Sequence, residues 1–161
     1  MSIRPAKEAD LPAILEIYAY ARAQMRANGN PNQWGSDRPP LAAIKADIRL
    51  SRSYVLEKGG KIEGVFAFFI GDDPTYSVIE DGAWRSDAPY GVIHRIARGE
   101  NGQGLLALAL EFAERQISHL RIDTHADNKI MQHLLEKYGF FKCGRIYTDD
   151  GTARIAYERT R

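Results

Sequence analysis

The pattern of apolar and polar positions along the chain predicts one α/β unit. Apolar residues recur every three or four positions, the spacing of an amphipathic helix, at 11–28, 41–48, 102–116 and 130–138. Short apolar or alternating runs, typical of strands, are found at 2–4, 54–58, 62–70, 92–97, 120–124, 140–147 and 153–159. This order, β-α-α-β-β-β-α-β-α-β-β, predicts an α/β fold with a single mixed, mostly antiparallel sheet and helices on both faces.

Local signals set several of the element boundaries. Gly59 and Gly60 separate two strand-like runs and predict a two-residue hairpin turn. The run from Val65 to Ile70 is apolar without alternation, so both faces of this strand should be covered. Asp127 or Asn128 is expected to cap the last helix, and Gly139 is expected to end it in the left-handed conformation.

Length and composition indicate a single globular domain over residues 1–161, with 44% hydrophobic and 27% charged residues. The net charge of +1 gives no reason to expect nucleic acid or an anionic membrane as a partner. No apolar run approaches the roughly 20 residues of a membrane span, and the first residues lack the apolar segment of a signal peptide. We therefore expect a cytoplasmic location.

Cysteine and histidine usage argues against disulfide and metal chemistry. The single cysteine, Cys143, excludes an internal disulfide and agrees with a reducing compartment. It lies among apolar residues, so burial is expected rather than a nucleophilic role. The histidines at 94, 119, 125 and 133 are scattered and lack the spacing of metal ligands, so no metal cofactor is expected.

The stretch 91–108 carries the strongest chemical signal. A strand-like run is followed by Arg98, a glycine-rich turn from Gly99 to Gly104, and then helical spacing. The N–H groups in the first turn of a helix have no partner within the helix and attract anions, and glycines let a phosphate approach closely. The turn therefore predicts a pyrophosphate site, although a tight connection without a ligand would have the same pattern.

Two common phosphate-binding loops fit this stretch poorly. A dinucleotide fold needs Gly-x-Gly-x-x-Gly behind an early strand, whereas these glycines lie two-thirds of the way along the chain. A P-loop ends in Gly-Lys-Ser/Thr, whereas Gly104 is followed by Leu105 and Leu106. The expected ligand is therefore a different cofactor that carries a pyrophosphate.

Two motifs match those of a known family. Gly102-x-Gly104 matches the end of Arg/Gln-x-x-Gly-x-Gly/Ala, although Gly99 stands at the Arg/Gln position and Arg98 lies one residue early. The second motif, Asn-x-x-Ala-x-x-Leu-Tyr-x-Lys-x-Gly-Phe, is matched at Asn128, Leu134, Lys137, Gly139 and Phe140, with Met131 for the Ala and Leu135 for the Tyr. Together with the element order, these motifs resemble the GCN5-related N-acetyltransferase (GNAT) family over nearly the whole chain. The segments 33–34, 94–97 and 121–125 further resemble an uncharacterised bacterial branch of that family.

The resemblance implies binding of acetyl-CoA and transfer of its acetyl group to an amine by direct attack. It also implies a bulge in the strand 92–97 that interrupts pairing with the strand 120–124, so that pantetheine adds to the freed edge. The residues that it assigns to the cofactor are Ile96, Ala97, Arg98, Gly102, Gln103, Gly104 and Leu105, through their backbone, and Asn128. Among these, the N–H of Ala97 would stabilise the oxyanion.

The reaction needs a general base to take a proton from the amine and an acid to protonate the leaving thiolate. His94 and His125 are the candidates for the general base, because imidazole titrates near neutrality and each lies near the end of a strand bordering the expected cleft. Either could equally be an ordinary hydrogen-bonded histidine. Leu135 occupies the position of the family's tyrosine acid, so Tyr138 or Tyr147 is the candidate for the acid.

The acceptor pocket has weaker signals in the sequence. Trp34, in a polar loop, and Trp84, in the long connection 71–89, are candidates for its walls, and anchoring in the core would explain them equally. The acceptor itself could be a small-molecule amine or a peptide N-terminus.

Two other functions stay open at this stage. The chain could be a non-catalytic module that binds or senses CoA on the same scaffold, which Leu135 and the shifted Arg98 favour. It could also be a structural domain whose glycine loop binds nothing. The oligomeric state is equally open, because the final strands could pair across a homodimer.

Overall fold

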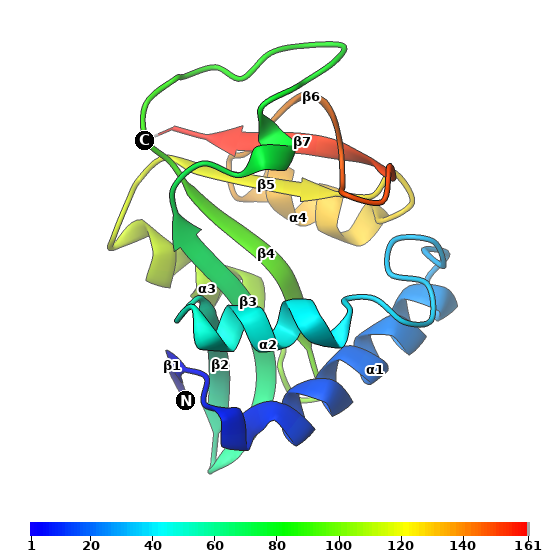
Figure 1. Ribbon diagram of the computed structural model, residues 1–161, viewed down its shortest axis with the longest axis vertical. Helices are drawn as coiled ribbons and strands as arrows, with labels where there is room; N and C mark the ends of the chain where they lie inside the picture. Colours follow the sequence, from blue (N-terminus) through cyan, green and yellow to red (C-terminus); the bar gives the residue numbers. More distant parts are fainter. Residues whose placement is uncertain (161) are drawn as a thin grey trace.

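A seven-stranded sheet forms the centre of the computed structural model, which describes residues 1–160 (Figure 1). The strands are β1 Ser2–Pro5, β2 Ser53–Lys58, β3 Lys61–Ile70, β4 Gly91–Arg98, β5 Leu120–Thr124, β6 Phe141–Tyr147 and β7 Ala153–Arg159. The helices are α1 Leu11–Ala27, α2 Leu41–Arg49, α3 Leu105–Glu114 and α4 Lys129–Lys137, with short 3-10 helices at Glu8–Asp10 and Pro74–Tyr76. The strand order is β1-β2-β3-β4-β5-β7-β6, and every neighbouring pair is antiparallel except β4 and β5. The predicted fold class is confirmed.

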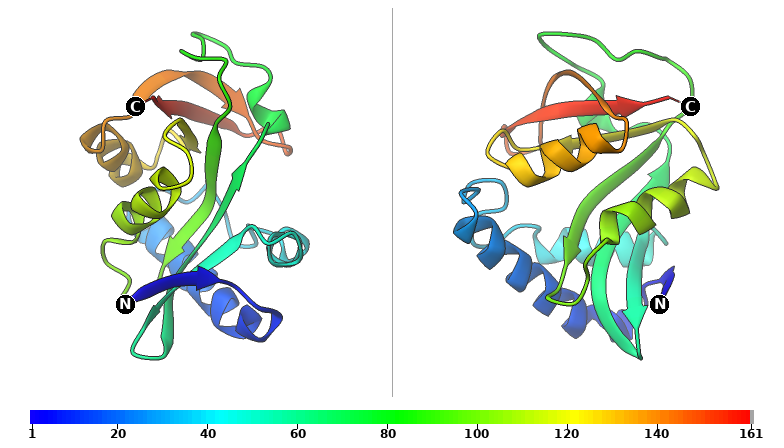
Figure 2. Two further views of the ribbon diagram at one scale, coloured as in Figure 1. Left: turned by 90° about the vertical axis from the view of Figure 1, so that its left-hand side faces the viewer. Right: turned by 180° about the vertical axis from the view of Figure 1, so that it is seen from behind.

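The helices cover both faces of the sheet. Figure 2 shows α1 and α2 on one face and α3 and α4 on the other. Strand β3 runs between the two layers: Val65 packs in the cluster formed with α1 and α2, whereas the next residue, Phe66, packs in the cluster formed with α3 and α4. Both side chains are at most 1% exposed. The absence of alternation in this strand therefore has the expected cause.

The turn signals in the sequence fall where they were expected. Gly59 and Gly60, with φ angles of 55° and 79°, join the paired residues at the facing ends of β2 and β3. Asn128 caps α4, since its Oδ1 accepts a hydrogen bond of 3.0 Å from the Met131 N–H. Gly139 has a left-handed backbone with φ of 87°, and the N–H of Phe140 donates a hydrogen bond to the Leu135 carbonyl in the last turn of α4.

The start of α3 differs from the prediction of a helix from residue 102. Gly104 has a left-handed backbone, with φ of 81°, and the helix begins only at Leu105. Helical spacing of the side chains continues back into the loop, but a left-handed residue cannot belong to a right-handed helix. The residues 102–104 therefore form a separate turn before the helix.

A bulge interrupts β4 opposite Phe66. Val65 pairs with Ala97 and Ala67 pairs with His94, so two residues of β4, Arg95 and Ile96, oppose one residue of β3. Arg95 has a φ of 49°, in the left-handed region that a residue with a side chain rarely adopts. The bulge that the family resemblance implied is thus present.

Contacts from α1 and α2 hold this bulge in place. The guanidinium of Arg95 donates two hydrogen bonds, of 2.6 and 2.8 Å, to the carboxylate of Asp47 in α2. The hydroxyl of Tyr18 in α1 donates to the Arg95 carbonyl at 2.7 Å. Burial, together with the Asp47 charge, raises the pKa of this tyrosine, so its hydroxyl stays protonated as a donor. Two helices therefore fix the side chain and the carbonyl of one residue.

The long connection 71–89 is an ordered cover over the face of β5, β7 and β6 that α4 leaves open (Figure 2). Glu80 exchanges two backbone hydrogen bonds, of 2.9 and 2.8 Å, with Arg145 on the outer edge of β6. The guanidinium of Arg121 lies between the rings of Trp84 and Tyr90, at 4.1 and 4.0 Å from their centroids. The connection thus closes one sheet edge and packs against the sheet through aromatic residues.

A buried carboxylate ties this connection to the sheet. Glu158 is fully buried and accepts hydrogen bonds from His119 at 2.7 Å, from Arg121 at 3.0 Å and from the backbone N–H of Arg85 at 2.6 Å. Two donors at the start of β5 and one in the 71–89 connection therefore depend on one side chain.

We expect Glu158→Gln to lower the free energy of unfolding by about 3–5 kcal/mol, because it leaves Arg121 buried without its counter-charge. The matched control is Glu111→Gln, which removes an exposed pair with Arg115 and should change stability by about 0.5 kcal/mol or less. Urea unfolding followed by circular dichroism measures both. Equal small effects for the two variants would contradict a structural role for Glu158.

Candidate active site

Strands β4 and β5 separate directly after their first contact. These two parallel strands pair only at Gly91 with Leu120 and at Val92 with Arg121. Beyond Val92 the strands diverge, as Figure 1 shows. The edge of β4 that faces β5 is therefore unpaired along the part that contains the bulge, as the resemblance implied.

The first turn of α3 offers backbone donors next to this edge. Among the described residues, no acceptor is found for the N–H groups of Gln103, Gly104, Leu106 and Ala107. They meet the requirement of an anion site at a helix N-terminus. The amides of Gly102 and Leu105, which the sequence analysis also assigned to the cofactor, donate within the turn at 3.2 and 3.3 Å. The amides that are available to a ligand therefore lie partly further along the chain, into the first turn of α3, than the sequence analysis expected.

Gly102 has a steric role in this turn. A Cβ atom added to it would lie 2.2 Å from the Glu63 carbonyl oxygen in β3, so no other residue fits without moving backbone. Gly104 provides the left-handed conformation that turns the chain into α3. The two glycines of the motif therefore determine the shape of the loop.

A cavity of about 290 Å³ extends from this turn along α4. Its lining includes Ile96, Ala97, Arg98, Gly104 and Leu105 from the predicted cofactor set, and Asn128 at the start of α4. Tyr138 also lines it, at the far end of α4. Six of the eight predicted cofactor residues thus line one cavity, which we call the cofactor cavity; Gly102 and Gln103 do not line it.

A second cavity, of about 380 Å³, lies on the other side of the gap. Charged side chains from the 71–89 connection, β4, β5 and β7 line it, among them Asp73, His94, Asp123 and Arg154. The two cavities share four lining residues, which are Met25, Ile96, Asn128 and Met131. They therefore meet where β4 and β5 separate, and we call the second one the acceptor cavity.

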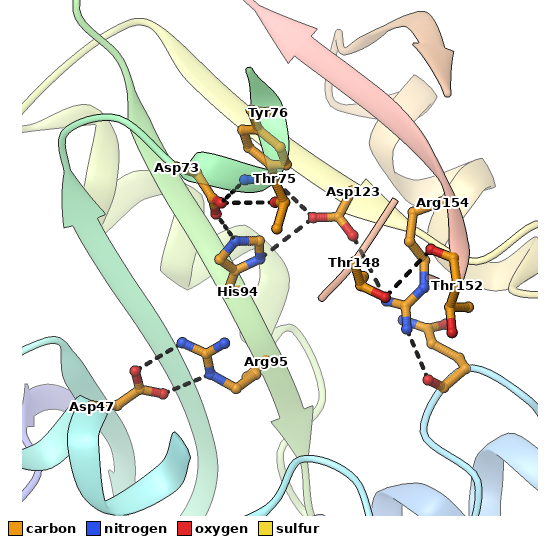
Figure 3. A network of polar contacts seen from close by, with 11 residues as sticks. Asp47, Asp73, Thr75, Tyr76, His94, Arg95, Asp123, Thr148, Thr152 and Arg154 are labelled. Carbon is orange, nitrogen blue, oxygen red and sulfur yellow. Dashed lines mark hydrogen bonds and ion pairs between the residues drawn. The ribbon is translucent and has the colours of Figure 1, made fainter. Parts of the chain in front are cut away.

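His94 lies between two carboxylates in the acceptor cavity (Figure 3). Its Nε2 contacts Asp73, and its Nδ1 is 3.5 Å from Asp123 Oδ1. The Tyr76 hydroxyl donates to Asp123 at 2.6 Å, and Thr75 donates to Asp73 through both its N–H and its hydroxyl. The imidazole is therefore oriented by residues of the 71–89 connection and of β5.

The protonation of Asp73 follows from these contacts. Burial by itself would raise the pKa of its carboxyl group, but the hydrogen bond from His94 and those from Thr75 outweigh burial and lower the pKa to about 2. Asp73 is thus a carboxylate at neutral pH, and it favours a proton on the nitrogen of His94 that faces it. In the neutral tautomer that this contact favours, the lone pair is on Nδ1, which faces Asp123.

His125 is positioned differently. Its Nδ1 accepts a hydrogen bond of 3.0 Å from the Asp127 N–H, which closes the turn before α4, and it lines neither cavity. The structure therefore gives it a structural contact and does not place it as a base. Sequence alone could not separate it from His94.

The two tryptophans also occupy different environments. Trp34 lines the acceptor cavity and packs edge-on against Tyr18, so it is both a core residue and a pocket wall. Trp84 lines neither cavity: its Nε1 donates to the Tyr76 carbonyl at 2.9 Å and its ring covers Arg121. The prediction that Trp84 lines the acceptor pocket is wrong, because the 71–89 connection packs that ring on the sheet.

The oxyanion role expected for the N–H of Ala97 is not supported. Hydrogen-bonding directions alternate along an antiparallel strand, and Gly99 donates to the Glu63 carbonyl of β3. Ala97, two residues earlier and paired with Val65, faces β3 by the same alternation. The backbone of Arg98, between them, faces the gap instead.

Other chemistry is not indicated. Residues 1–160 contain no group of three or more His, Cys, Asp or Glu side chains that could hold a metal ion. Cys143 is buried, and burial together with the Glu158 charge raises the pKa of its thiol, which is unfavourable for a nucleophile. None of the helices in the same range is long and apolar enough to cross a membrane.

Comparison with known proteins identifies the family. No protein-family model and no curated protein matches the chain. Among solved structures, a GNAT-family acetyltransferase from Streptococcus agalactiae is 30% identical, covering 99% of this chain and 95% of its own, with a TM-score of 0.84. This chain belongs to the GNAT family.

More distant structures share the fold. A GNAT-family acetyltransferase from Listeria monocytogenes is 20% identical over 98% of this chain and 93% of its own, with a TM-score of 0.72. A ribosomal-protein-alanine N-acetyltransferase from Brucella melitensis is 21% identical over all of both chains, with a TM-score of 0.63. Membership of the family supports acetyl transfer as the general activity.

Several residues of the site had no signal in the sequence. Asp73 lies in a connection whose apolar residues have no helix or strand spacing. Arg154 is a charged residue near the start of a strand, where charged residues are common. Asn30 is 3% exposed and lines the cofactor cavity, and its Oδ1 has no partner among the described residues. Asp73 and Arg154 join this GNAT site through contacts with residues far away in the chain.

The lowered pKa of Asp73 predicts a pH-dependent contribution to stability. Because the folded-state pKa of about 2 is below the unfolded value near 3.8, the carboxylate stabilises the fold above about pH 4 and loses this effect as the pH falls toward 2. The difference in unfolding free energy between the wild type and Asp73→Asn should therefore shrink over that range. Urea titrations between pH 2 and pH 5 measure it.

Asp72→Asn is the matched control, because this neighbouring side chain is exposed and has no hydrogen bond among the described residues. Its effect on stability should be small and change little over the same range. A constant difference for Asp73→Asn down to pH 2 would show that the contacts with His94 and Thr75 do not form as described.

Proposed function

We propose that this GNAT protein transfers the acetyl group of acetyl-CoA to an amine by direct attack. One observation carries the proposal: two cavities, one beside a helix N-terminus with available amides and one lined by charged groups, meet at the gap between β4 and β5. A thioester held from the first cavity and an amine held in the second would come together at that gap. The carbonyl carbon and the amine nitrogen are the reacting atoms.

The residues present fit acetyl-CoA. The amides of Gln103, Gly104, Leu106 and Ala107 would bind the pyrophosphate, because they have no acceptor among the described residues and lie at the positive end of a helix. The unpaired edge of β4 near Ile96 and Arg98 would hold the pantetheine arm as an added strand. Bound in this way, the co-substrate supplies an activated acetyl group, and the protein forms no covalent bond to it.

A residue of the acceptor cavity can act as the general base. An amine reaches the site as an ammonium ion and must lose a proton before it can attack. His94 is the one candidate base of the sequence analysis that lines the cavity, and Asp73 orients it. Its Nδ1 would take the proton, while Asp123 keeps the ammonium close.

The proton that the leaving thiolate needs has a candidate donor in Tyr138. Leu135, at the position of the family's tyrosine, is fully buried among α3 and the sheet and cannot serve. Tyr138 lies about one turn further along, lines the cofactor cavity, and its hydroxyl has no hydrogen bond among the described residues. A tyrosine acid is therefore available despite the change at 135.

A charge introduced at the α3 N-terminus tests the anion site. Ala107 lines the cofactor cavity in the first turn of α3, and Ala107→Glu should weaken acetyl-CoA binding by about tenfold or more, because a like charge in a partly buried site costs a few kcal/mol. Ala107→Gln has nearly the same size without the charge and should keep affinity within about threefold. Titration calorimetry measures both. Unchanged affinity in the glutamate variant would refute the loop assignment.

The base is tested by comparing the two histidines. His94→Asn should lower kcat by about 100-fold or more and remove the acidic limb of the pH–rate profile. His125→Asn should leave both unchanged, since His125 lines neither cavity. Thiol release from acetyl-CoA over a panel of amines gives the rates. A thermal shift with acetyl-CoA but no thiol release with any amine would indicate a CoA-binding module instead of an enzyme.

A further inference from the structure

Among the buried charged groups of the acceptor cavity, Arg154 has the most unused hydrogen-bond donors. Its side chain is only 10% exposed, yet the one hydrogen bond it makes among the described residues is from Nη2 to the Gln33 carbonyl at 2.8 Å. Its Nη1 is 3.7 Å from Asp123, beyond hydrogen-bond distance, and its Nε is buried without a partner. A guanidinium has five N–H donors, and burying it with most of them unused is unfavourable.

The buried carboxylates of the same cavity are already supplied with donors. Asp73 accepts from His94 and Thr75, and Asp123 accepts from Tyr76 (Figure 3). By contrast, Arg52 lines the cavity and stacks over the Phe69 ring at 4.4 Å, with no ion pair to a described carboxylate. Among the buried charged groups of the cavity, it is therefore a cation, Arg154, that has hydrogen-bond donors left over.

Asp123 lies between His94 and Arg154, so it indicates how far apart these two side chains are. Its Oδ1 is 3.5 Å from His94 Nδ1, and its Oδ2 is 3.7 Å from Arg154 Nη1, so a single carboxylate separates the proposed base from the guanidinium. A ligand that reaches both must be short. An amine and an anionic group separated by a few bonds would fit, whereas the backbone of a peptide N-terminus has an uncharged amide where a free amino acid has its carboxylate.

We infer that the acceptor is a compact amino-carboxylate, whose amine lies beside His94 and whose carboxylate binds the guanidinium of Arg154. This inference rests on the proposed acetyl transfer and names the substrate class for it. Arginine suits the task because its planar group binds a carboxylate through two parallel hydrogen bonds. The carboxylate of the ligand would supply the acceptors that Arg154 lacks.

The experiment measures thiol release from acetyl-CoA with paired acceptors. One set contains the twenty amino acids together with β-alanine and 4-aminobutyrate, and the other contains the carboxamide of each compound. At least one acid should be acetylated with a kcat/KM about tenfold or more above that of its own amide. Arg154→Gln should bring this ratio close to one, and Arg154→Lys should restore part of it.

The ratio compares two acceptors on the same preparation, so partial misfolding of a variant does not affect it. Arg145→Gln is the matched control, because Arg145 lines neither the cofactor nor the acceptor cavity, and its ratio should equal that of the wild type. Amides used as well as acids, or a ratio that Arg154→Gln leaves unchanged, would overturn the inference while acetyl transfer stands. No thiol release with any acid, amide, polyamine or short peptide would overturn the proposed function and this inference with it.

Discussion

The bulge at Arg95 is the constraint on which the rest of the site depends. A left-handed backbone at a residue with a side chain costs about 1–3 kcal/mol, and it persists only where the surroundings fix it. Here Asp47 holds the guanidinium through two short hydrogen bonds and Tyr18 holds the carbonyl, so α1 and α2 together fix one residue of β4. The pairing of β4 with β5 stops at Val92, the bulge lies on the unpaired edge beyond it, and the two cavities meet at this gap.

The polar loop between α1 and α2 spans this gap and links the two halves of the molecule. The Gln33 side chain accepts hydrogen bonds from Asn30 at 2.9 Å and from Asn128 at 3.0 Å, and its carbonyl accepts one from Arg154. The end of α1, the start of α4 and the start of β7 are therefore joined through one residue. Asn128, assigned to the cofactor from its motif, has a structural task as well: it caps α4 and fastens this loop.

The two cavities have different chemistry because different elements build them. Apolar side chains of α3 and α4 line the cofactor cavity, which suits the long, uncharged pantetheine arm, and the amides at one end suit the pyrophosphate of the same co-substrate. The acceptor cavity takes charged side chains from the 71–89 connection and from β4, β5 and β7. His94 is oriented by buried carboxylates, whereas Arg154 is left with few partners. The inferred preference for an amino-carboxylate rests on this difference.

By itself, the sequence determined the helices and strands, the hairpin at Gly59 and Gly60, the caps at Asn128 and Gly139 and the position of the glycine loop, because these depend on residues close together in the chain. The family motifs added the bulge and the gap. The tertiary structure decided which of two similar residues lies in a cavity: His94 contacts Asp73 and Asp123 in the acceptor cavity, whereas His125 only closes a turn, and Trp34 lines that cavity whereas Trp84 does not. These choices depend on strand register and on the path of the 71–89 connection. Both are set by contacts between residues far apart in the sequence, which no local pattern records.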